Sequence, residues 1–162
     1  MVIAALISAG VVLAAVQIWV LNPLAARPGT SLATIYAEMR QAGQFSVLGE
    51  TLGALTLVSG LVVAAALLRE GLRPPGLPTA GVVMVGGLCM ALAVPAYWWA
   101  SFSMGMSLAD TYGIGGGDHS PWARPLFGLS AMGLAAVVVG AVSGSWTWKS
   151  RVPPAGGSAR RA

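Results

Sequence analysis

Four long runs of apolar residues divide the chain, and most polar residues lie in the segments between them. Each run is long enough to cross the roughly 30 Å hydrocarbon core of a bilayer as a helix. The apolar residues are continuous rather than alternating, so helices satisfy the backbone hydrogen bonds in lipid better than barrel strands do. The pattern predicts an all-α membrane protein with one domain over 1–148, a four-transmembrane-helix bundle with helices at about 2–21, 45–68, 79–100 and 125–148.

The segments that flank these runs predict how the helices end and meet. Asn22-Pro23 is expected to stop the first helix, and Pro95 is expected to kink the third helix because it removes one backbone hydrogen bond. The short connection between the second and third helices predicts that they are antiparallel neighbours. The glycine-rich segment 101–123 is expected to be a loop.

The connection between the first and second helices carries a different pattern. Leu32, Ile35, Tyr36 and Met39 recur at the spacing of one helix face. This pattern predicts a short amphipathic helix at about 31–42 in the first outer loop, lying flat at the membrane surface. The alternative is a lid over a pocket.

Composition supports the membrane interpretation. The chain is 56% hydrophobic and 9% charged, with a mean hydropathy of +0.77, whereas soluble domains carry about 25% charged residues. The net charge of +4 comes largely from the basic tail, 149–162, which is expected to be disordered and cytoplasmic. Outside that tail no basic stripe favours nucleic acid as a partner. The single cysteine, Cys89, excludes an intramolecular disulfide.

Charge also predicts the orientation. If the N-terminus is inside, the inner side holds six basic residues and the outer side three: Arg69, Arg73, Lys149, Arg151, Arg160 and Arg161 against Arg27, Arg40 and Arg124. The positive-inside rule then places both termini in the cytoplasm. Arginine outnumbers lysine by eight to one, a bias typical of GC-rich codons. We therefore expect a multi-pass protein of a bacterial cytoplasmic membrane.

Glu50 is the one acidic residue inside an apolar run. Helix rise places it about 7–8 Å below the outer boundary, at a depth that other polar residues share. The expected polar layer, a candidate ligand-binding pocket, consists of Gln17, Glu50, Thr51, Tyr97 and Ser130.

A buried carboxylate in lipid needs compensation. Glu50 is expected to be protonated, to pair with Arg40 or Arg124, or to accept hydrogen bonds from Gln17 and Tyr97. It serves either as a tie between helices or as a functional carboxylate that handles a proton or a cation.

The outer loop offers a second candidate site. Met104, Met106 and His119 combine thioether and imidazole groups, the ligands that suit copper, with Asp110 and Asp118 nearby. The alternative is a loop that binds no metal. The sequence predicts no cofactor, and no catalytic motif indicates an enzyme.

Three functional hypotheses remain at this stage. The first is a non-enzymatic accessory or structural subunit of a membrane complex. The second is a small transporter or ligand-binding protein that uses the outward-facing layer around Glu50, and the third is an outer-loop copper-binding or enzymatic protein. The expected partners are the lipid bilayer and either larger membrane subunits or a second copy, joined through small-residue helix faces such as Gly49-x-x-x-Gly53 and Gly140-x-x-x-Gly144.

Overall fold

The computed structural model describes residues 1–73 and 79–149, and side chains as far as 142. Over these ranges the chain forms helices and turns without a strand, and four helical segments are long and apolar enough to span a membrane: Val2–Ala26, Val47–Leu72, Thr79–Tyr112 and Pro121–Val142. The all-α prediction with four membrane-length helices is therefore confirmed. The predicted disordered tail lies, apart from Lys149, outside the described residues.

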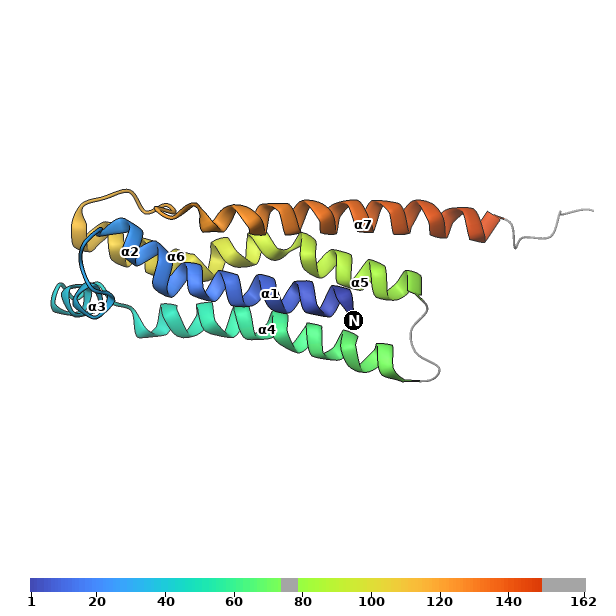
Figure 1. Ribbon diagram of the computed structural model, residues 1–162, viewed down its shortest axis with the longest axis horizontal. Coiled ribbons are helices and arrows are strands. Elements are labelled where there is room, and N and C mark those ends of the chain that lie inside the picture. Colours follow the sequence, from blue (N-terminus) through green and yellow to red (C-terminus); the bar gives the residue numbers. More distant parts are fainter. Residues whose placement is uncertain (74–78, 150–162) are drawn as a thin grey trace, which may run out of the picture.

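The segments run back and forth along one long axis (Figure 1). The N-terminus, the last turn of α4, the first turn of α5 and the last turn of α7 share one end, which we call the terminal end. The short helices α2 and α3 and the α6–α7 connection share the opposite end, which we call the loop end. The helices alternate in direction, as the predicted topology requires.

The first spanning segment continues past its proline. Helix α1 (Val2–Val16) passes through a π turn, η1 (Gln17–Leu21), into α2 (Asn22–Ala26). The prediction that Asn22-Pro23 stops this helix is therefore wrong. In the wider turn the backbone N–H of Asn22 donates to the carbonyl of Gln17, and Pro23 stands in the first turn of α2, where a missing N–H is tolerated.

The third spanning segment is longer than the sequence predicts. Helix α5 (Thr79–Ala91) breaks at Leu92, and α6 continues over Ala93–Tyr112. The predicted break occurs three residues before Pro95, because this proline cannot donate to the carbonyl of Ala91. The prediction of a loop is wrong for 101–112, which is helical until Gly113, at φ +65°, ends α6 in a left-handed conformation.

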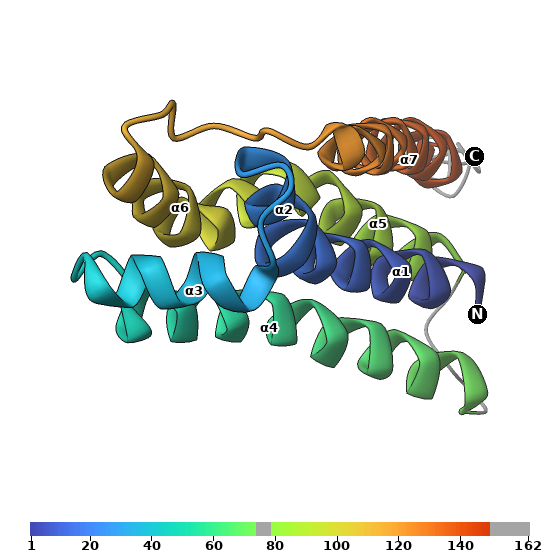
Figure 2. The ribbon, with the colours of Figure 1, turned by 60° about the vertical axis from the view of Figure 1, so that its left-hand side comes forward.

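The connection between the first and second spanning segments contains α3 (Leu32–Gln41), which the Ser31 side chain caps by accepting a hydrogen bond from the N–H of Thr34. Ile35 and Met39 of α3 are fully buried, and the helix packs against α2 and α6 (Figure 2). Helix α4 (Val47–Leu72) follows.

The break at Leu92 divides the third segment between two neighbours. Helix α5 packs most extensively on α7 (Arg124–Lys149), whereas α6 packs on α4. Helix α4 also contacts α5, so the predicted neighbours do meet, but the closest packing of α4 is with α1 and α6. A three-residue turn, η2 (Pro121–Ala123), leads into α7.

Glycines set the closest helix approaches. A Cβ on Gly133 of α7 would lie 2.3 Å from the backbone nitrogen of Ala91, and one on Gly53 would lie 2.7 Å from the carbonyl oxygen of Ala100. A Cβ on Gly49 would likewise meet the side chain of Ser103 on α6. The Gly49-x-x-x-Gly53 face therefore packs within one chain.

Candidate functional site

Glu50 lies in the first turn of α4, where Ser46 caps the helix. Its Oε2 accepts a hydrogen bond of 2.7 Å from the indole Nε1–H of Trp19 in the π turn. Its Oε1 is buried and has no hydrogen-bond partner among the described residues. Neither of the expected arginines holds Glu50, so the donor that partly compensates its burial is an indole from the first spanning segment.

The backbone of Trp19 is held by a second group. The Tyr36 hydroxyl of α3 donates to the Trp19 carbonyl oxygen at 3.0 Å. This carbonyl lies four residues before Pro23, which has no N–H to offer it. Burial, reinforced by the charge of Glu50, raises the pKa of Tyr36 to about 12, while Arg40 opposes the shift. Tyr36 therefore keeps its proton and remains a donor.

A matching arrangement surrounds Pro95 of α6. The Ser130 hydroxyl of α7 donates to the Ala91 carbonyl oxygen at 2.5 Å, and this is the carbonyl that Pro95 leaves without its usual donor. In both places, a hydroxyl from a different element donates to the carbonyl four residues before the proline.

The other residues of the expected polar layer form hydrogen bonds that do not reach Glu50. Gln17 is fully buried, with its Nε2 donating to the carbonyl of Ser120 at 3.3 Å and its Oε1 unpartnered within the described chain. The Tyr97 hydroxyl donates to the carboxylate of Asp118. Thr51 is exposed and bonds to the Val47 carbonyl of its own helix. The hydrogen bonds of these side chains lead to different partners.

Further hydrogen bonds join the helices and connections at the loop end to one another. The Tyr112 hydroxyl of α6 donates to Glu38 of α3 at 2.7 Å, and the Ser107 hydroxyl donates to the Gln44 carbonyl at 2.8 Å. The N–H of His119 donates to Oδ1 of Asn22 at 2.6 Å. Helices α2, α3 and α6 and the α6–α7 connection are therefore held at several points.

The proposed copper ligands are not brought together. Met104 and Met106 lie on helix α6 rather than in a loop. Because they are two residues apart, their side chains point in directions that differ by about 200° around the helix axis. Met104 is accordingly buried in the core, whereas Met106 is 42% exposed. His119 Nε2 lies 2.9 Å from the Gly115 carbonyl. Within the described ranges no group of three or more His, Cys, Asp or Glu residues could hold a metal ion.

An apolar cavity of about 250 Å³ lies near the break between α5 and α6. Its lining includes Gly10, Gly60, Cys89, Leu92 and Leu129. Two hydroxyls reach it, but those of Thr56 and Ser59 donate to carbonyls of their own helix. The cavity therefore suits an apolar group and offers no chemistry of its own.

The sequence interpretation missed two residues that matter most for this site. Trp19 was not included in the expected polar layer, although it lies only two residues beyond Gln17. Asp118 was considered only with the metal set, although Tyr97 is its partner. Shared depth could have indicated Trp19, whereas the pairing of Asp118 depends on how the connection folds back on α6.

A comparison of the chain with protein-family models, curated protein sequences and solved structures gave no match.

Proposed function

We propose that this protein is a non-enzymatic integral membrane protein that serves as an accessory or structural subunit of a larger membrane complex. The observation that carries the proposal is the use of its buried polar side chains. Glu50 bonds to Trp19, Ser130 to Ala91 and Gln17 to Ser120, each joining two elements of the chain. Such bonds stabilise a scaffold, because they leave few groups free to bind or transform a substrate.

The exposed helix faces favour a partner within the same membrane. Leu55 and Val62 of α4 and Val138 and Val139 of α7 are each more than half exposed, so lipid or another protein covers them. The closely packed glycines Gly49 and Gly53 are occupied inside the chain. A partner would therefore pack on large aliphatic side chains rather than on a small-residue face.

The proposal places the chain in a bacterial cytoplasmic membrane with both termini and the terminal end in the cytoplasm. The excess of basic residues near that end supports this orientation. Helix α3 would then lie outside as an amphipathic helix at the membrane surface, with its polar face toward water.

The test is affinity purification of the tagged full chain from its native membrane in mild detergent, after cross-linking in the membrane. We expect a larger membrane protein to co-purify at a fixed ratio, and Glu50→Gln to leave this ratio unchanged, because the amide oxygen still accepts from Trp19. Recovery of the cross-linked chain without any partner would contradict the proposal.

A small transporter or ligand-binding protein is the second candidate, and one observation favours it. The Oε1 atoms of Glu50 and Gln17 are both buried without a partner in the described chain, and a bound proton, cation or water would satisfy such atoms. This candidate requires Glu50→Gln to abolish transport or ligand binding while the protein still folds. The same variant therefore separates the two functions.

A further inference from the structure

The loop end carries another polar site where α6, the α6–α7 connection and the start of α7 meet. One cavity of about 390 Å³ is lined by Asn22, Tyr97, Trp98, Phe102, Asp118 and Phe127. A second, of about 420 Å³, is lined by His119 and Arg124 and shares Asp118 and Phe127 with the first. We call the two together the Asp118 cleft. Their volumes lie in the range of roughly 300–1,000 Å³ that is typical of small-molecule sites.

The first cavity has the features of a cation site. The Tyr97 hydroxyl donates to Oδ1 of Asp118 and so fixes the carboxylate at the cavity wall. The rings of Trp98 and Phe102 line the same cavity, 5.9 Å apart between centroids, and are 63% and 55% exposed. Aromatic rings and a carboxylate together attract an ammonium group.

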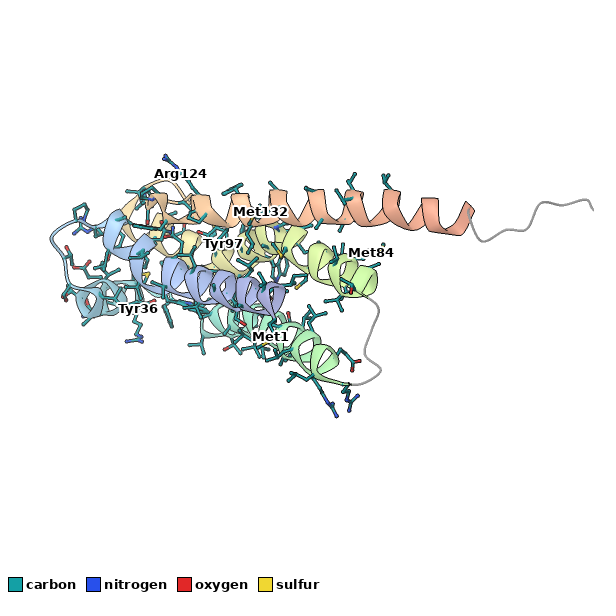
Figure 3. The ribbon with its side chains drawn as sticks, turned by 45° about the vertical axis from the view of Figure 1, so that its right-hand side comes forward. Met1, Tyr36, Met84, Tyr97, Arg124 and Met132 are labelled. Carbon is teal, nitrogen blue, oxygen red and sulfur yellow. The ribbon has the colours of Figure 1, made fainter. Side chains whose placement is uncertain are left out.

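The second cavity adds an opposite charge. Arg124 is exposed, and Figure 3 shows its side chain directed away from the helices at the start of α7. Within the described ranges, 1–73 and 79–149, the single ion pair joins Arg73 to Glu70. Asp118 and Arg124 line one cavity, and no salt bridge joins them within those ranges. A ligand with both charges would satisfy both residues.

A hydrocarbon core that begins at Thr79 would place the cleft at the depth of lipid headgroups. Counted from Thr79, about 20 helical residues span the hydrocarbon core and reach about Trp98. Asn22, just beyond the π turn, and Phe127, in the first turn of α7, line the same cavity. Arg124 lies one helical turn farther out. A ligand in the cleft would thus face water with its charges and lipid with the rest of its surface.

We propose that the Asp118 cleft binds the headgroup of an amine-bearing zwitterionic phospholipid, with the ammonium against Asp118 and Trp98 and the phosphate against Arg124. Guanidinium groups bind phosphate through paired hydrogen bonds. The acyl chains would follow the exposed rings of Phe102 and Phe127 into the bilayer. This proposal goes beyond the proposed function and holds whether or not the chain has a protein partner.

Native mass spectrometry of the purified full chain in detergent tests the proposal. Phosphatidylethanolamine is titrated against phosphatidylglycerol, which has the phosphate but no ammonium. We expect the wild type to bind phosphatidylethanolamine about fivefold more tightly, since a charge pair and a cation–π contact are added. Asp118→Asn, which keeps an acceptor for Tyr97, should remove this preference, and Arg124→Gln should weaken binding of both lipids.

Matched controls are available on the same chain. Asp110→Asn changes an exposed carboxylate elsewhere on α6, and Arg69→Gln changes an exposed arginine near the terminal end, so neither should alter the preference. Equal binding of both lipids by the wild type, or an unchanged preference in Asp118→Asn, would overturn the proposal. Soluble phosphoethanolamine that competes at the concentration of the lipid would overturn the lipid as the source of the headgroup.

A second variant keeps the test decisive if Asp118→Asn fails to fold. Trp98→Leu with Phe102→Leu changes two exposed rings, so folding should survive. The double variant should lose most of the preference for phosphatidylethanolamine. A preference that persists in this variant would also overturn the proposal.

Discussion

At the loop end, hydrogen bonds join elements far apart in the sequence, as between Trp19 and Glu50 and between Tyr112 and Glu38. In the half toward the terminal end, which we call the terminal half, Gly133 and Gly87 bring the backbones of α5 and α7 close together, and the Ser130–Ala91 hydrogen bond adds to this contact. Tyr36 and Tyr97 lie toward the loop end and Met84 lies toward the terminal end (Figure 3). The difference follows from surroundings. In the proposed membrane location, close packing of small residues suffices between apolar helices in lipid, whereas short helices and connections near water would need directional bonds to fix their positions.

The largest effect is expected where the terminal half is packed most closely. Gly133→Ala would place a methyl group against the backbone of Ala91 and Gly87, which cannot rotate away as a side chain can. We expect a loss of about 3 kcal/mol in the free energy of unfolding, the upper part of the overpacking range. Unfolding by sodium dodecyl sulfate titration measures it.

Gly128→Ala on the same helix is the matched control, because nothing lies within 4 Å of its added Cβ. Alanine has the higher helix propensity, so stability should stay equal or rise slightly. If both variants were equally stable, glycine packing would not be what holds α5 to α7.

A smaller effect is expected at the carbonyl that Pro95 releases. Ser130→Ala removes the donor to Ala91 and should lower the free energy of unfolding by about 1 kcal/mol, the scale of interhelical hydrogen bonds in membranes. In a Pro95→Ala background the backbone N–H of residue 95 can return to that carbonyl. In that background, Ser130→Ala should lower the free energy of unfolding by less than it does in the wild type, as measured by the same sodium dodecyl sulfate titration.

Thr51→Val provides the comparison, because the Thr51 hydroxyl bonds to a carbonyl within its own exposed helical turn. Its loss should change stability by less than about 0.5 kcal/mol. An effect of Ser130→Ala that is the same with and without Pro95 would show that the proline and the serine are not linked.

The apolar pattern was sufficient for the four membrane-length helices, because length and hydropathy alone decide whether a segment can cross lipid. It failed for 101–112, where glycine, serine and methionine suggested a loop. The buried residues Ala100, Met104 and Leu108 are nevertheless spaced as one helix face. This spacing was present in the sequence, but it crosses residue 100, where the third membrane helix was expected to end. Helix α6 continues past that residue.

The candidate site was harder to predict, for a physical reason. Depth along a helix follows from rise per residue, so an approximate level for each polar side chain could be predicted. The rotation of each helix about its axis and the course of the connections could not be predicted from the sequence. Those decide that Glu50 meets Trp19 and that Tyr97 meets Asp118. The π turn at Gln17–Leu21 also changes the rotation of everything before it.

The double-mutant cycle of Trp19→Phe and Glu50→Leu tests the central claim, that buried polar groups at the loop end join elements of the chain. Trp19→Phe alone leaves the buried Glu50 carboxylate without its indole donor, whereas Glu50→Leu removes the carboxylate itself. We predict a coupling energy of about 1 kcal/mol in the free energy of unfolding, with the double variant at least as stable as Trp19→Phe. Additive effects of the two substitutions would contradict the claim and leave Glu50 as a ligand-binding carboxylate.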